Sequence, residues 1–271
     1  MNHLTAAQIR QYHALGYVAG PRVLDDAQID RLKSRIEDIL ARRVPFPDLL
    51  LGETVSKNDQ KGQLPSVKVV NIFRHDAVFA EVIRSEAIGS VARDLFEGPV
   101  RIWEDQMIYK PPFDSDAVLG WHRDYTYWDH VGPDELGTCW IALDDATLEN
   151  GCMHVIPGSH CWEFEYHRED VDGNDPRWPL RPERVPEDAN LTEVPCEVPA
   201  GHCHFHHCRT LHGSYGNRTD NPRRSYILHL MPGSTRRIGD NWNERQATVD
   251  VPLGEIVQGP QYPELIAPAT A

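Results

Sequence analysis

The amino-acid sequence predicts a mainly β fold, a barrel or jelly roll with α-helices packed outside it. Before Val100 most patterns are helical, whereas after it the chain consists of short β-type runs separated by Pro, Gly, Asn and Asp. Several short strands at modest spacing are typical of all-β barrels and jelly rolls. We expect residues 1–271 to form a single domain, because this length and a hydrophobic content of 40% lie in the ordinary globular range.

Two capping boxes predict helices near the start of the chain. Thr5-x-x-Gln8 begins a short helix that ends at Gly16, and Asp25-x-x-Gln28 begins a second helix that continues to about residue 42. The apolar residues of the second helix recur at intervals of three and four: Ile29, Leu32, Ile36 and Ile39. This stripe needs a partner surface, so we expect the helix to pack against the rest of the fold.

The remaining segments are assigned from their composition and periodicity. Residues 44–66 are rich in Pro, Gly and polar residues and are predicted to be a loop, and residues 77–96 carry a helical pattern. The acidic, Pro-rich stretch 161–199 is predicted to be an excursion from the barrel. Strands are expected at 67–70, 100–109, 120–124, 137–143, 153–156, 203–207 and 224–230.

The charge and composition of the chain argue against several classes of partner. A formal charge of −14 repels phosphate backbones and anionic lipid headgroups, so we expect neither nucleic acid nor a membrane surface as a partner. We find no apolar run of transmembrane length, no secretory signal and no C-terminal address, and we expect a cytoplasmic protein. The six cysteines form no C-x-x-C pair, so reduced, mostly structural thiols are expected.

The segment Trp121-His122-Arg123-Asp124 indicates a metal site. If it forms a strand, alternation places His122 and Asp124 on one face and Arg123 on the other. A later histidine, His212, is the candidate for a third ligand. Two histidines and one carboxylate leave three positions of Fe(II) open, as O2 and a bidentate co-substrate require. A lone H-x-D motif is weak evidence, so the surrounding motifs decide.

Those motifs resemble the phytanoyl-CoA dioxygenase family. The similarity runs in order from about residue 5 to residue 232. It rests on Trp121-His122-Arg123-Asp124-Tyr125, Trp140-Ile141-Ala142-Leu143-Asp144-Asp145, Glu149-Asn150-Gly151, Ile156-Pro157-Gly158-Ser159-His160 and His212-Gly213-Ser214, followed by Asn217-Arg218 and Pro222-Arg223-Arg224. The resemblance implies a cupin-like double-stranded β-helix with N-terminal helices packed on it. It also implies Fe(II), 2-oxoglutarate and O2, and hydroxylation of an aliphatic carbon of a small-molecule substrate with release of succinate and CO2.

Carried over by position, the resemblance makes His122, Asp124 and His212 the catalytic iron ligands. Arg223 resembles the family's arginine for the distal carboxylate of 2-oxoglutarate, where a guanidinium makes two parallel charge-assisted hydrogen bonds. In a strand the adjacent Arg224 points to the opposite face, so only one of the pair can bind. We favour Arg223 and interpret Arg224 as a solvated surface charge. Four further positions match the co-substrate site: Ser214, Gln106, Lys68 and Trp140.

Contacts with the substrate are less constrained by the sequence. Four residues within or after the metal motif are candidates for reaching the substrate cavity: Arg123, Tyr125, Tyr127 and Trp128. Core packing is the alternative role for at least two of the aromatic residues. The substrate, the site of oxidation and the oligomeric state stay open.

The stretch 201–208 is the densest cluster of metal-binding residue types, but we do not predict a zinc site there. Alternation splits its side chains between two faces, and no second thiolate pair is available. The similar stretch of the family is a strand leading to the distal histidine, usually with an acidic residue in place of His202. Other histidines are expected to be structural: His130, His154, His160 and His229.

Two alternatives to hydroxylation stay open. Another iron-dependent oxidation, such as desaturation, epimerisation or epoxidation, would use the same three ligands. A non-catalytic cupin-like binding protein would need neither the intact ligand set nor Arg223, so the presence of both disfavours it.

Overall fold

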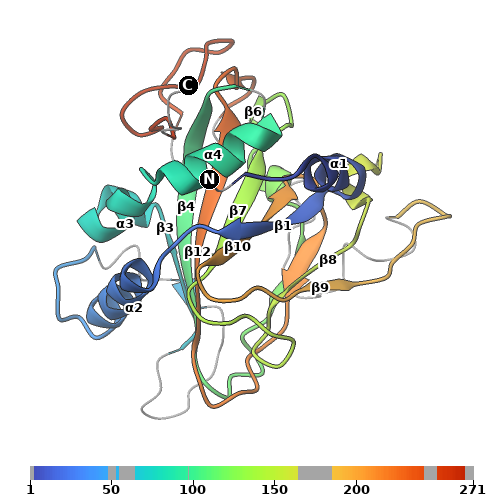
Figure 1. Cartoon of the computed structure of the whole chain (residues 1–271). Helices are drawn as coiled ribbons and strands as arrows, with labels where there is room; N and C mark the ends of the chain where they lie inside the picture. The colour runs from blue at the N-terminus through green and yellow to red at the C-terminus, as the bar shows by residue number, and fades with distance from the viewer. Residues whose placement is uncertain are drawn as a thin grey trace.

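The structure, a computed structural model, describes residues 3–47, 53–54, 65–96, 98–163, 185–240 and 249–265. Most of its strands belong to two sheets, and helices lie along one side of the larger sheet (Figure 1). In chain order the elements are α1 (Ala6–Leu15), β1 (Tyr17–Arg22), α2 (Asp26–Leu40), β2 (Glu53–Thr54), β3 (Val67–Val70), η2 (Ile72–Arg74), α3 (Ala77–Val82), α4 (Glu86–Phe96), β4 (Val100–Lys110), β5 (Leu119–His122), η3 (Asp124–Tyr127), β6 (Val131–Gly132), β7 (Gly137–Ala142), β8 (Met153–Val155), η4 (Ser159–Cys161), β9 (Val194–Cys196), β10 (His202–His207), β11 (His212–Ser214), β12 (Arg223–Pro232) and β13 (Arg236–Arg237), where η marks a 3-10 helix.

The two sheets form the expected architecture. The larger sheet has the strand order β1-β10-β7-β12-β4-β3-β2, and the smaller sheet has the order β5-β11-β8-β9. A separate pair joins β13 to β6. All of these strand pairs are antiparallel. The prediction of a mainly β jelly roll is therefore confirmed.

Helices cover the outer face of the larger sheet. In β12, Tyr226, Leu228 and Leu230 join one buried cluster with residues of α1, α2, α3 and α4. The ring of Tyr226 meets that of Phe79 in α3 edge-on, with 5.0 Å between centroids. None of these helices, nor any other within the described residues, has the length and apolar content needed to cross a membrane. The N-terminal helices thus pack on the barrel, as predicted.

Local signals fix the two N-terminal helices. Thr5 and Asp25 each accept a hydrogen bond from the backbone N–H three residues later, and the side chains of Gln8 and Gln28 return to the caps. The predicted stripe of α2 has an exposed fraction of 4% or less: Ile29, Leu32, Ile36 and Ile39. Each of these side chains contributes roughly 1.5–3 kcal/mol through its burial, so the stripe holds α2 on the sheet.

The space between the two sheets holds a second apolar cluster. Its members include inward-facing residues of both sheets: Ile108, Trp140, Met153, Val155 and Ile227. Ile227 of β12 has Trp140 of β7 and Gln106 of β4 as its register partners. Because inner and outer positions alternate, a polar residue at an inner position of these strands is enclosed in the barrel.

The prediction of one helix over 77–96 is wrong. The segment forms two helices, α3 and α4, with a break between Val82 and Glu86. The carbonyl of Ser85 accepts from the N–H of Gly89, so Ser85 stands at the start of α4. Serine is favoured at that position because its hydroxyl can satisfy free N–H groups, and this break therefore had a local signal.

Other boundaries also differ from the predictions. The unpredicted strand β1 lies at a sheet edge and has a register shift between Ala19 and Arg22, next to a proline that an edge tolerates. Strand β9 lies within 161–199 and pairs with β8, so the described end of this stretch belongs to the barrel. The predicted loop 44–66 contains β2, which pairs with β3, and most of that loop lies outside the described residues.

Arg224 is not the solvated surface charge that we expected. It lies at the outer face of β12 and is buried, with Nε and Nη2 donating to the two oxygens of Asp144 at 2.8 and 3.0 Å. Its Nη1 donates to Glu37 of α2 at 2.8 Å, and Lys33 of α2 pairs with Asp144 at 2.8 Å. Arg224 therefore ties α2 to the larger sheet.

Replacing Arg224 with methionine should lower the free energy of unfolding by roughly 2–3 kcal/mol, somewhat less than for a fully buried pair, because Lys33 still faces Asp144. Urea denaturation measures this change. Arg224→Lys should lose less stability than Arg224→Met because lysine keeps the positive charge. An unchanged urea midpoint in Arg224→Met would contradict the proposed role of this ion-pair network.

Candidate metal centre

The three predicted ligands come from neighbouring parts of the smaller sheet. His122 is the last residue of β5, His212 is the first residue of β11, and the two are register partners. The prediction that Asp124 lies in a strand is wrong, because Asp124 begins the 3-10 helix η3. Arg123 is nevertheless extended, with φ −114° and ψ 134°, so the alternation continues for one residue and Asp124 returns to the side of His122.

The donor atoms of these residues meet inside the barrel. Oδ1 of Asp124 lies 3.7 Å from Nε2 of His122 and 3.5 Å from Nε2 of His212. The centroids of the two imidazole rings are 4.2 Å apart. One donor atom from each residue lies within 4.8 Å of the others, and within the described part of the chain no second group of three shares this spacing. The arrangement can hold one metal ion.

Backbone carbonyls orient both imidazoles. Nδ1 of His122 donates to the carbonyl of Gly120 at 2.7 Å, and Nδ1 of His212 donates to the carbonyl of Thr210 at 2.9 Å. A neutral imidazole has only one N–H hydrogen, which here lies on Nδ1, so each Nε2 keeps a lone pair for a metal. Burial, together with the neighbouring His212, lowers the pKa of His122 to about 3 and keeps this ring neutral.

The electrostatics of the centre suit a cation. Burial alone would raise the pKa of Asp124, but the neighbouring imidazoles of His212 and His206 hold that pKa well below its ordinary value. Burial alone would lower the pKa of His212, but Asp124 raises it. A buried carboxylate thus draws positive charge to this point, and a divalent cation supplies it.

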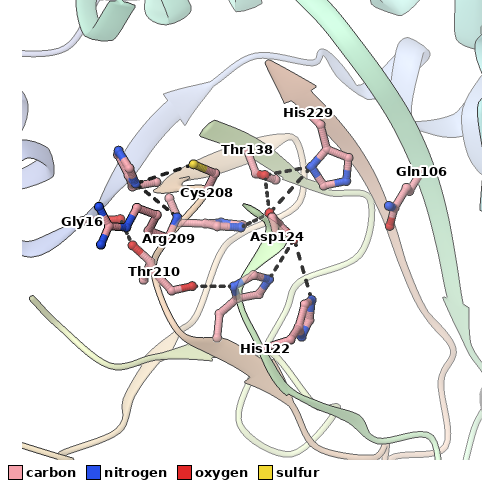
Figure 2. A network of polar contacts seen from close by, with 12 residues as sticks. Gly16, Gln106, His122, Asp124, Thr138, Cys208, Arg209, Thr210 and His229 are labelled. Carbon is pink, nitrogen blue, oxygen red and sulfur yellow. Dashed lines mark hydrogen bonds and ion pairs between the residues drawn. The ribbon is translucent and has the colours of Figure 1, made fainter. Parts of the chain in front are cut away.

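Asp124 is also the centre of a network of polar contacts. Figure 2 shows Thr138 and His229 on one side of it and His122 on the other. Oγ1 of Thr138 lies 2.7 Å from Oδ2 of Asp124 and 2.8 Å from Nδ1 of His229. Nε2 of His206 lies 3.2 Å from the same Oδ2. The larger sheet therefore contacts Oδ2, whereas the histidines of the smaller sheet face Oδ1.

A cavity adjoins the three donor atoms, and Arg223 lines it. Arg223 is 1% exposed, its guanidinium lies 5.4 Å from the ring centroid of Trp140, and it donates to Ser225 and to the carbonyl of Gly151 at 3.0 and 3.2 Å. Burial lowers the pKa of Arg223 to about 10, so the group stays cationic at neutral pH. It has no ion-pair partner among the described residues, which fits an anionic ligand. All five positions predicted for the co-substrate line this cavity: Arg223, Ser214, Gln106, Lys68 and Trp140.

Lys110 is a second buried basic residue beside this cavity, and the sequence did not indicate it. It is the register partner of Arg223 and has no exposed surface. Its Nζ donates to Oγ of Ser214 at 2.7 Å and to the carbonyl of Tyr215. Because Oγ of Ser214 accepts this hydrogen bond, the serine hydroxyl hydrogen is left to donate to a ligand.

None of the four candidates for substrate contact lines the cavity formed by the described residues. Arg123 is buried and donates to the carbonyl of Ser159 at 2.8 Å. Trp128 belongs to an apolar cluster that includes Trp103, and Tyr125 and Tyr127 pack against it, which is the core role considered for at least two of these aromatic residues. The ring of Tyr127 also lies 6.2 Å from that of His122, and its role as a substrate contact stays a prediction.

The histidine-rich strand β10 behaves partly as expected. Cys203 and Phe205 face the helices, whereas His204 and His206 face the interior, so alternation splits this cluster between two faces. His206 nevertheless reaches the metal centre through Asp124. His229, expected to be structural, also lines the cavity.

The other histidines expected to be structural lie outside the cavity. His130 is 5.6 Å from Trp103 between ring centroids, His154 is 3.6 Å from Glu193, and His160 is 5.4 Å from His207 between centroids.

Period-two alternation could have found most of the missed residues. Counting two residues back from the predicted Trp140 reaches Thr138, and counting four residues on from Gln106 reaches Lys110. His229 follows in the same way from Arg223. His206 had no such neighbour among the predicted residues, because its strand was interpreted only as a connection to the distal histidine.

Comparisons with known proteins support the family resemblance. The family model described as phytanoyl-CoA dioxygenase (PhyH) matches residues 12–225. A probable phytanoyl-CoA dioxygenase from Caenorhabditis elegans is 24% identical over 239 residues, covering 83% of this chain and 75% of the relative. L-proline trans-4-hydroxylase from Streptomyces griseoviridis is 31% identical over 160 residues, covering 58% of this chain and 55% of the relative.

A solved structure supports the fold. The epimerase SnoN, crystallised with Fe3+, α-ketoglutarate (2-oxoglutarate) and nogalamycin RO, matches with a TM-score of 0.72 at 22% identity, covering 96% of this chain and 98% of that chain. The double-stranded β-helix expected from the sequence is therefore the fold of this chain.

Replacing His122 with alanine should weaken binding of a divalent cation by more than the roughly 10–100-fold that loss of an outer partner costs. Calorimetric titration of the metal-free protein with Co(II) measures this affinity. His202→Ala is the matched control, because His202 lies on β10, outside the cavity. Equal affinities of the two variants would place the metal elsewhere.

Proposed function

We propose, given that the chain belongs to the phytanoyl-CoA dioxygenase family, that it is an Fe(II)- and 2-oxoglutarate-dependent dioxygenase that hydroxylates an aliphatic carbon of a small molecule. One observation carries the proposal. The lone pairs of His122, Asp124 and His212 converge beside a cavity that contains a buried Arg223, for which the described residues offer no ion-pair partner. A metal and an anionic co-substrate are what these two features require.

In this proposal His122, Asp124 and His212 hold the iron on one side. Two nitrogen ligands and one carboxylate are the facial set that leaves three positions open. When bound there, Fe(II) allows O2 to convert 2-oxoglutarate to succinate and CO2, with one oxygen atom going to succinate and the other to the substrate carbon. The protein contributes orientation of the ligands and exclusion of water.

Arg223 and Ser214 would hold the distal carboxylate of 2-oxoglutarate. The planar guanidinium offers parallel N–H donors and lies over the ring of Trp140, 5.4 Å from its centroid. The Ser214 hydroxyl, which accepts from Lys110, is oriented to donate to the same carboxylate. Gln106 also lines the cavity and would complete the polar wall.

A second outcome on the same iron site is another oxidation of the substrate. The specific observation in its favour is that an epimerase crystallised with Fe3+ and α-ketoglutarate shares the fold. A non-catalytic binding protein is disfavoured, because binding alone would not need a buried Arg223 beside an intact ligand set.

Under anaerobic conditions, Fe(II) and 2-oxoglutarate should give the visible metal-to-ligand charge-transfer band of a chelated 2-oxo acid. Anaerobic absorption spectroscopy of the wild-type protein measures it. Arg223→Met should weaken 2-oxoglutarate binding, whereas Arg224→Met, on the opposite face, should retain the band. Absence of the band in wild type with iron bound would contradict co-substrate chelation.

Catalysis is tested by succinate release across a panel of candidate small molecules, with product masses identified. His122→Ala and Asp124→Ala should both abolish substrate-dependent succinate formation, because each removes a proposed ligand. Succinate formation at the wild-type rate in either variant would contradict the proposed ligand set.

Lys110→Met should raise the dissociation constant for 2-oxoglutarate about tenfold or more, because Lys110 orients the Ser214 hydroxyl that would donate to the co-substrate carboxylate. A hydrogen bond to a charged group contributes about 1.5–3 kcal/mol. Titration of the charge-transfer band measures this constant. If Lys110 acts through Ser214, Lys110→Met and Ser214→Ala should be less than additive in the double variant. Full additivity would show that the lysine acts independently of the serine.

A further inference from the structure

We propose that Thr138 and His206 hold the carboxylate of Asp124 so that it presents a single oxygen, Oδ1, to the metal. This inference rests on the proposed function and assigns a positioning role to two residues of the larger sheet. Asp124 reaches the centre from η3, at the end of the smaller sheet. Thr138 lies in β7 and His206 in β10, which are adjacent strands of the other sheet.

The contacts of the two carboxylate oxygens are divided between the sheets. Oδ2 lies 2.7 Å from Oγ1 of Thr138 and 3.2 Å from Nε2 of His206. Oδ1 is the oxygen that lies 3.7 Å from His122 and 3.5 Å from His212. One oxygen is therefore hydrogen-bonded, and the other faces the proposed ligand histidines.

The directions of these hydrogen bonds follow from what each group can donate. A carboxylate only accepts, so the Thr138 hydroxyl hydrogen points to Oδ2 and the ring of His206 donates through Nε2. Oγ1 of Thr138 is then free to accept from Nδ1 of His229, at 2.8 Å. Both Thr138 and His206 are 1% exposed, so water does not compete for these contacts.

The consequence concerns the number of open positions at the metal. An ion bound by Oδ1 and two Nε2 atoms has three positions left in an octahedral arrangement, two for the 2-oxo acid and one for O2. A carboxylate that turned to bind through both oxygens would occupy one of these positions. Because Oδ2 has two donors on the far side, turning it toward the metal would break both hydrogen bonds.

The chain offers a matched control for this role. His204 lies two residues before His206 on the same face of β10 and is also 1% exposed. Its ring stacks on that of His206 at 5.3 Å between centroids and lies 5.8 Å from that of Trp140. Replacing either histidine with phenylalanine keeps a ring in the same buried layer, but only at position 206 does it remove a donor to Asp124.

The test compares Co(II) binding and the Co(II) d–d absorption spectrum in wild type, His206→Phe, Thr138→Val and His204→Phe. We expect the first two variants to lose about 10–100-fold in Co(II) affinity and to change the spectrum, because the carboxylate is freed to change its coordination. His204→Phe should keep both at wild-type values. His206→Gln, which retains an N–H donor, should recover part of the affinity.

Unchanged affinity and spectrum in both His206→Phe and Thr138→Val would overturn the inference, as would an equal loss in His204→Phe. If His206→Phe fails to fold, Thr138→Val decides alone, since valine has the shape of threonine without its hydroxyl. The charge-transfer band of wild type with Fe(II) and 2-oxoglutarate separates the two levels. If wild type lacks that band, the proposed function fails. If wild type shows the band but His206→Phe and Thr138→Val bind Co(II) as wild type does, only the positioning role fails.

Discussion

The site depends on the burial of one carboxylate. Removing a carboxylate from water costs several kcal/mol unless hydrogen bonds and opposite charge compensate, and Asp124 lies almost entirely inside the barrel. The two sheets share this compensation: one faces Oδ1 with imidazole nitrogens, and the other faces Oδ2 with a hydroxyl and an imidazole. The polar residues at inner positions of otherwise apolar strands are therefore needed to compensate for the burial of this carboxylate.

The same constraint explains which parts of the site could be predicted. Alternation within a short segment predicted that His122 and Asp124 share a face and that Arg223 and Arg224 do not, and the family resemblance favoured Arg223 of that pair. That rule held for Asp124 even though β5 ends before it, because Arg123 stays extended. Motif order along the chain then selected His212 as the third ligand, and the structure makes it the register partner of His122.

Residues whose roles depend on contacts between strands were harder to predict. Alternation from Gln106 places Lys110 on the inner face of β4, but its position beside Arg223 depends on the register of β4 and β12, which the sequence does not fix. The same is true of His206, which meets Asp124 across the space between two sheets. Arg224 was misjudged for a related reason, since the opposite face of β12 is covered by α2 rather than by water.

The fold followed local signals where these were strong. Both capping boxes and the stripe of α2 are present as predicted, because their contacts lie within a few residues. The break at Ser85 and the irregular edge strand β1 were missed, since a short interruption hardly changes hydrophobic periodicity. The candidates for substrate contact lie outside the cavity lining for a geometric reason: η3 turns the chain after Asp124, and Tyr125, Tyr127 and Trp128 contact the apolar cluster that includes Trp103.

The neighbouring arginines of β12 have one more consequence. Arg223 supplies a buried cation to the cavity, and Arg224 joins a helix to the sheet, from opposite faces of one strand. A slip of β12 by one residue would exchange these faces. Arg224 would then face the cavity in place of Arg223, and α2 would lose its ion pair with the sheet. An insertion or deletion before β12 that shifts this register would therefore destabilise the fold and misplace Arg223 at the same time. The strand pairing that docks α2 correctly also directs the guanidinium of Arg223 into the barrel.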